Sequence, residues 1–178
     1  MKKIIFLLSI LFSINMIQAQ QFAATDKYTI VNQSSSKEQE YTTYVDIITT
    51  SDDPDKITTL KVSYLDVLED ITLTLLSNPN IENIKEIIKV DIYYTSCCSS
   101  LETHYFMVTE SDDYIFLPVI ENTYCEDASS EVQYIFPGQV SGKENTIVKA
   151  EVYDAQDYKV IQSMIWNDDE LAFNTSVF

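Results

Sequence analysis

The sequence contains no arginine, only two glycines and a single histidine among its 178 residues. Without arginine, the chain cannot form a bidentate guanidinium clamp on a phosphate or a carboxylate. The two glycines, Gly138 and Gly142, lie in one short segment, so neither a glycine-rich phosphate loop nor a dinucleotide-binding fingerprint can be built. The sequence therefore argues against nucleotide-dependent catalysis.

Positive charge is also scarce, because 28 acidic residues stand against 11 lysines and the formal net charge is −17. A surface of this sign repels a phosphate backbone, so neither a nucleic acid nor a nucleotide is expected as a partner. It attracts basic proteins instead, through steering that weakens as salt is added. The composition favours a basic protein partner.

Residues 1–19 have the pattern of a secretory signal peptide. Lys2 and Lys3 precede an apolar run, and a small residue, Ala19, suits cleavage. The competing interpretation is a membrane anchor, but the run is shorter than the roughly 20 apolar residues that a span needs. We predict cleavage after Ala19, a secreted or periplasmic location and no stable membrane insertion of the mature chain. The mature chain would keep nine lysines against 28 acids, a formal charge of −19.

The remaining chain divides into a flexible N-terminal segment and one domain. Residues 20–40 are polar and turn-rich, with a short strand expected at 27–31. Residues 41–178 are expected to form a single globular domain, because the length suits one core and no linker interrupts it.

A long amphipathic helix is predicted at about residues 54–77. Asp53 suits the N-cap, Pro54 suits the first helical position, and seven apolar residues share one helical face. Many of its residues are β-branched, which lowers helix propensity, so the helix would depend on packing. The alternative is a pair of strands at 60–65 and 71–76.

Elsewhere, apolar residues recur at every second position, which is typical of strands. Strands are expected at 41–50, 88–94, 101–110, 114–124, 132–136, 146–154, 159–166 and 171–173. Together with the helix they predict an α+β fold, in which the helix packs on a twisted antiparallel sheet of six to eight strands. An all-β sandwich is the alternative.

Three cysteines allow one disulfide and leave one thiol. A bond between the adjacent Cys97 and Cys98 would be strained, so Cys125 is the expected partner of one of them. Strand phase favours Cys98, because it continues the inward series that ends at Tyr94. A bridge from Cys98 to Cys125 closes a loop of about 27 residues.

No residue pattern predicts an active site. The lone His104 lies mid-strand with no second histidine for a metal, and Ser34-Ser35-Ser36-Lys37 matches a Ser-x-x-Lys spacing without its companion motifs. Acidic turns at 52–55, 112–113, 126–127 and 168–170 contain carboxylates of the kind that bind calcium, though none has calcium-loop spacing.

Twelve tyrosines are also present, several of them on expected strands. Tyrosine packs on sheets and is also favoured at recognition surfaces. We therefore expect an exported, acidic, non-enzymatic binding or accessory protein of the cell envelope or extracellular space that engages a basic protein. The alternatives are a small secreted hydrolase that uses carboxylates or His104, and a calcium-stabilised surface module.

Overall fold

The structure is a computed structural model that describes residues 20–33, 41–125, 130–154, 157–167 and 172–177. These residues form twelve strands in three antiparallel sheets and contain no helix. The expected α+β fold is therefore wrong, and the all-β alternative matches. No helix in the described part of the chain is long and apolar enough to cross a membrane.

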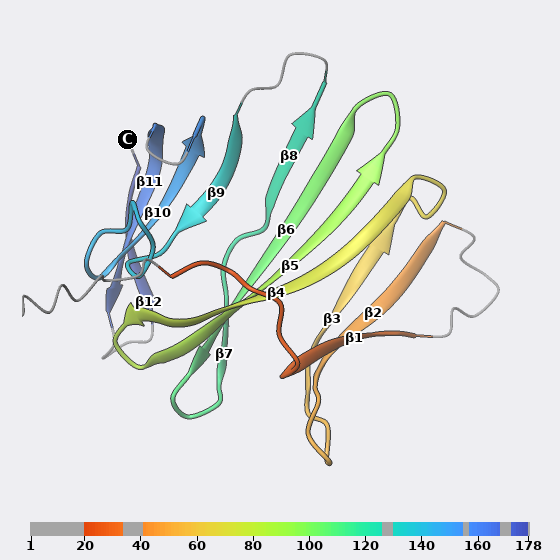
Figure 1. The fold of residues 1–178 in the computed structure, drawn as a ribbon, viewed down its shortest axis with the longest axis horizontal. Helices are drawn as coiled ribbons and strands as arrows, with labels where there is room; N and C mark the ends of the chain where they lie inside the picture. Colours follow the sequence, from red (N-terminus) through yellow and green to blue (C-terminus); the bar gives the residue numbers. More distant parts are fainter. Residues whose placement is uncertain (1–19, 34–40, 126–129, 155–156, 168–171, 178) are drawn as a thin grey trace, which may run out of the picture.

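The three sheets follow one another along the chain (Figure 1). The N-terminal sheet has the order β1-β2-β3, with β1 at Tyr28–Asn32, β2 at Thr42–Thr49 and β3 at Lys56–Ser63. The central sheet has the order β4-β5-β6-β7, with β8 also paired to β6; its strands are β4 (Leu68–Ile81), β5 (Ile84–Thr95), β6 (Ser99–Thr109), β7 (Tyr114–Phe116) and β8 (Ile120–Tyr124). The C-terminal sheet has the order β12-β11-β10-β9, with β9 at Glu131–Ile135, β10 at Thr146–Val152, β11 at Tyr158–Asn167 and β12 at Ala172–Val177.

The central sheet is buried on both faces. On one face, Ile88, Val90 and Ile92 of β5 join a cluster with side chains of the N-terminal sheet such as Val45 and Val62. On the other face, a second cluster unites the central sheet with the C-terminal sheet; it includes Ile87, Tyr105, Met107, Tyr134, Phe136 and Ile147. The central sheet is therefore the middle layer of the fold, and β5 contributes buried apolar side chains to both clusters, Ile88, Val90 and Ile92 to one and Ile87 to the other.

The predicted helix at 54–77 is replaced by β3 and the first part of β4. In β3, Leu60 and Val62 are buried, whereas Thr59 and Lys61, which alternate with them, are exposed, as expected for the two-residue period of a strand. The apolar residues of this segment are so closely spaced that they fit the period of a helix as well as the period of a strand. The β-branched residues favour the extended form, and pairing with β2 and β5 stabilises it.

The expected helix ends have other roles. Asp53 and Pro54 lie in the connection between β2 and β3, so Asp53 caps no helix. The expected C-terminal end near Pro79 is a bulge in β4, where Asn78 and Asn80 adopt left-handed backbone conformations (φ 51° and 57°). Because β4 is an edge strand, proline is tolerated there.

Most other expected strands are confirmed, with shifted ends, as β1, β2, β5, β6, β9, β10, β11 and β12. The segment 114–124 forms two strands rather than one, because Leu117–Val119 interrupt the antiparallel pairing with β6 between β7 and β8. The predicted single sheet of six to eight strands is also wrong, because the twelve strands of the described residues form three sheets of three, five and four strands.

The segment from Gln20 to Lys27 connects all three sheets (Figure 1). The Gln20 backbone N–H donates to the Gly138 carbonyl at 3.0 Å, and Ala23 pairs with Leu75 on the outer edge of β4. Phe22 packs against the rings of Tyr105 and Phe136. The predicted signal peptide at 1–19 and the Ser34-Ser35-Ser36-Lys37 motif lie outside the described residues.

Candidate binding cleft

A cleft of about 520 Å³ lies on the face of the central sheet that carries Tyr94. It extends from the end of β3 at Ser63 and from Tyr64, which follows that strand, across β5 and β6 to the edge strand β8. Among the described residues that line it are two glutamates, Glu102 and Glu121, and no lysine. The cleft is thus acidic on one side and aromatic on the other.

Strand register explains why these side chains meet. Glu102 of β6 is the Cα partner of both Ile92 on β5 and Glu121 on β8. Residues directly opposite each other on neighbouring strands point to the same face of a sheet. The side chains of Glu102 and Glu121 therefore project from the same face of the sheet on neighbouring strands, and Ser100, two residues earlier on β6, aligns with Tyr94 on that face.

Two tyrosines form the aromatic side. Tyr94 is buried at the base, and burial, followed by the charge of Glu102, raises the pKa of its hydroxyl to about 12. Tyr64 is 68% exposed at the rim, and its ring meets that of Tyr94 edge to face at 6.5 Å. The backbone of Tyr64 is left-handed (φ 58°), an uncommon conformation for a bulky residue.

His104 lies beside the acidic side of the cleft and contacts Glu102 and Phe106. Its Nε2 is 2.7 Å from Oε1 of Glu102, and its ring stacks on Phe106. Cys98 cannot act as a nucleophile for His104 because its sulfur is in a disulfide. The structure therefore pairs the lone histidine with a carboxylate that lines the cleft.

The disulfide joins Cys98 to Cys125, the pairing favoured by the sequence, with Cα atoms 4.7 Å apart. The strand-phase argument for this pairing does not hold, because Cys98 lies in the bend between β5 and β6 rather than on β5. Cys97 is a free, exposed thiol. The bond connects that bend to the end of β8, so it restrains the strand that carries Glu121.

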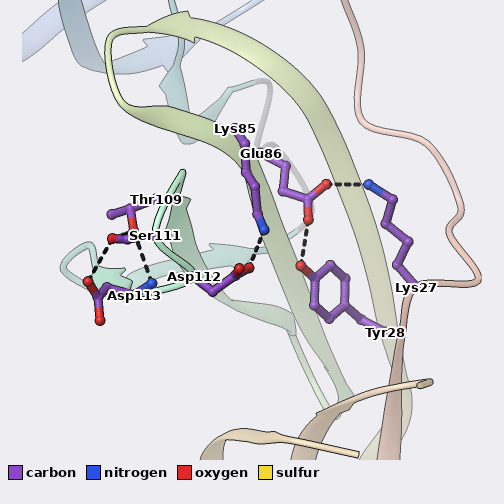
Figure 2. Close-up of polar contacts among 8 residues, drawn as sticks. All are labelled: Lys27, Tyr28, Lys85, Glu86, Thr109, Ser111, Asp112 and Asp113. Atoms are coloured by element: carbon purple, nitrogen blue, oxygen red, sulfur yellow. Dashed lines mark hydrogen bonds and ion pairs between the residues drawn. The ribbon is translucent and has the colours of Figure 1, made fainter. Parts of the chain in front are cut away.

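A second polar cluster, missed from the sequence, joins the N-terminal sheet to the central sheet (Figure 2). Glu86 of β5 is 4% exposed and accepts hydrogen bonds from the Tyr28 hydroxyl at 2.5 Å and the Lys27 ammonium at 2.7 Å. Burial and the bond to Glu86 raise the pKa of Tyr28. Because a buried carboxylate is costly without partners, this cluster holds two sheets together and is structural rather than a ligand site.

Beside it, the turn between β6 and β7 is also polar. Lys85 pairs with Asp112, and Ser111 donates to Asp113 at 2.8 Å (Figure 2). Burial, then the charges of Asp112 and Asp55, raise the pKa of Tyr114, so the acidic turns 52–55 and 112–113 both act on this residue. Even so, no group of three or more His, Cys, Asp or Glu within the described residues is placed to hold a metal ion.

Some tyrosines are packed in the core, and others are exposed to solvent. Tyr105 and Tyr134 are buried with ring centroids 5.2 Å apart, whereas Tyr153 is 46% exposed. Sequence reasoning did not select Tyr64, Glu102 or Glu121. The glutamates occupy polar positions of an alternating pattern, but nothing local shows that they are opposite each other. The acidic turns at 126–127 and 168–170 lie outside the described residues.

Comparison of the chain with protein-family models, curated proteins and solved structures found no match. The role of the cleft is therefore inferred from its geometry and chemistry.

Proposed function

We propose that this chain is an exported, acidic, non-enzymatic binding protein of the cell envelope or extracellular space, and that it engages a basic protein partner through the cleft. The observation that carries the proposal is the pairing of Glu102 with Glu121 opposite the two tyrosines. Carboxylates supply the charge that recognises a cation, and exposed aromatic rings attract it further.

The overall charge supports the same class of partner. A formal charge of −17, or −19 after the predicted cleavage, attracts a basic surface over a distance of about 10 Å at 0.1 M salt. Such steering raises the association rate more than it raises affinity. The cleft would then supply the short-range contacts that keep the partner bound.

A binding role is favoured over the hydrolase alternative by the groups around the carboxylates. Tyr94, with its pKa raised to about 12, stays a neutral phenol at physiological pH and is unsuited to exchange protons there. His104 is engaged with Glu102, and Cys98 is oxidised. A hydrolase would need one of the two glutamates as the acid and the other as base or nucleophile.

Binding to a basic model protein tests the proposal. Lysozyme, titrated into the mature chain in a salt series, is expected to bind at low salt. The variant Glu102→Gln/Glu121→Gln should bind about ten-fold more weakly. The matched control, Asp52→Asn/Asp53→Asn, removes the same charge from an exposed turn and should keep most of the affinity.

Equal losses in the two variants would mean that only net charge matters and the cleft has no part. If lysozyme does not bind at any point of the salt series, the proposed function is wrong. The hydrolase alternative is separated by incubation with chromogenic glycosides and esters. Turnover that disappears in Glu121→Gln but not in the turn variant would replace binding with catalysis.

A further inference from the structure

We infer that the cleft selects the guanidinium group of an arginine on the partner protein over the ammonium group of a lysine. The inference rests on the proposed function and deepens it, because it names the chemical group that enters the cleft. It follows from three features of the site: a pair of facing carboxylates, an exposed aromatic ring, and the absence of arginine from the chain's own sequence.

The pair of glutamates favours a cation as the ligand. Glu102 and Glu121 are direct cross-strand partners, an arrangement that is destabilising when both are charged. His104 Nε2 lies 2.7 Å from Oε1 of Glu102, and no lysine is among the described residues that line the cleft. A ligand that places positive charge between the two glutamates removes this repulsion, so charge complementarity defines the occupant.

The shape of the site favours a guanidinium. This group is planar and presents N–H donors along its edges, so a single group can donate to two carboxylates at once. Its flat face can stack on the exposed ring of Tyr64, which stands at the rim edge to face with Tyr94. A lysine ammonium is a compact point charge that is more strongly hydrated, and it gains less from an aromatic ring at an exposed site.

The occupant must come from a different protein. The sequence has no arginine, so neither the chain itself nor a second copy of it can supply a guanidinium. A volume of about 520 Å³ exceeds the needs of one side chain and accommodates its flanking backbone. An arginine on an exposed loop or extended segment of a basic partner meets these requirements.

The site is also held in place before any ligand arrives. The disulfide of Cys98 with Cys125 restrains one end of β8, and Asn122, next to Glu121, is hydrogen-bonded to the backbone of Val132. Pre-organisation of this kind reduces the entropy lost on binding. The register of the two backbone positions that carry the glutamates is therefore set by the fold rather than by the ligand.

Three peptides that differ only at one central residue test the inference. The centre is arginine, lysine or citrulline, which has the shape of arginine without its charge, in an otherwise neutral Gly/Ser sequence. Binding to the mature chain is followed by nuclear magnetic resonance titration. The arginine peptide should bind at least five-fold more tightly than the lysine peptide, and the citrulline peptide should cause no shift in the cleft.

Two substitutions separate the contributions. Tyr64→Asn, which suits the left-handed backbone at this position, should remove the preference for arginine and leave lysine binding nearly unchanged. Glu121→Gln should weaken both peptides. Tyr41→Asn, at another exposed tyrosine, is the control and should change neither.

Equal affinity for the arginine and lysine peptides would overturn the inference while the proposed function stands. Binding of the citrulline peptide as tightly as the arginine peptide would overturn it as well, since charge would then be irrelevant. If neither charged peptide binds but lysozyme still does, the cleft is not the cation site. If nothing basic binds, the proposed function fails together with the inference.

Discussion

The side-chain amide of Asn122 hydrogen-bonds to both backbone polar groups of Val132. Its Nδ2 donates to the Val132 carbonyl at 2.9 Å, and its Oδ1 accepts from the Val132 N–H at 2.8 Å. Asn122 lies on β8, at an edge of the central sheet, and Val132 lies on β9, at an edge of the C-terminal sheet. One side chain thus joins two sheets and protects an edge strand at the same time.

Replacing Asn122 with alanine is expected to destabilise the protein by about 2–3 kcal/mol, because both bonds are lost and two backbone groups keep no partner. Chemical denaturation of Asn122→Ala against the parent chain measures this. Thr123→Ala, at the exposed neighbouring position, should have little effect. A similar loss in both variants would show that the bridge to Val132 adds no stability of its own.

Removing the disulfide with Cys98→Ser/Cys125→Ser should cost about 3 kcal/mol, since the bond closes a loop with a sequence separation of 27. For a chain of this size that corresponds to a fall in Tm of about 6–12 °C. Cys97→Ser, which removes the exposed free thiol, should leave the Tm nearly unchanged. A larger effect from Cys97→Ser than from the double variant would mean that Cys97 forms the bond.

Alkaline pH is expected to unfold the protein. Burial is the main cause that raises the pKa of Tyr28, Tyr105 and Tyr124, and it raises the pKa of Tyr94 and Tyr134 to about 12. In the unfolded chain these hydroxyls ionise near pH 10. Because the folded-state pKa values are higher, the stability from neutral tyrosine is complete below pH 10 and decreases as the pH rises toward 12 and beyond.

Circular dichroism and tyrosinate absorbance, followed together from pH 9 upward, measure this loss. Ionisation of the buried tyrosines should coincide with loss of sheet signal. Tyr134→Phe should move the midpoint to higher pH, because it removes one of the groups that drive unfolding. If tyrosinate absorbance reached its full value while the sheet signal stayed intact, the buried hydroxyls would not be linked to folding.

Export should yield a chain that begins at Gln20. Expression of the full sequence in a secreting bacterial host, followed by intact-mass measurement of the released protein, should show loss of residues 1–19. A Lys2→Glu/Lys3→Glu variant, in which the positive end of the signal is reversed, should accumulate unprocessed. Recovery of the unsubstituted, full-length chain from the membrane fraction would favour the anchor interpretation.

Much of the fold could be predicted from local patterns in the sequence. Alternation of apolar and polar residues located β2, β5, β6, β10 and β11 within a few positions, since each strand has to bury at least one face. The segment 54–77 was misassigned because Ile57, Leu60, Val67 and Leu75 fit a helical stripe as well as two strands. Only hydrogen bonding to β2 and β5, which lie outside the segment, separates the two structures.

The candidate site could be predicted less well from the sequence than the strands could. Glu102 and Glu121 are ordinary polar positions in two strands, and Tyr64 follows a strand that was expected to be a helix. Their proximity depends on β8 pairing with β6 and on the turn after β3 bringing Tyr64 to Tyr94. These are contacts between strands, and no spacing along the chain encodes them.

Composition alone establishes what the protein lacks and what charge it carries: no arginine, two glycines, one histidine and a large acidic excess. Those counts hold for any fold, so they restrict the chemistry regardless of structure. Folding adds that three sheets form, that two of them cover the central one, and that two glutamates face each other across a strand pair. The physical reason is that alternation specifies which side of a strand is buried, whereas the partner strand and its register are set by hydrogen bonds and packing between distant segments.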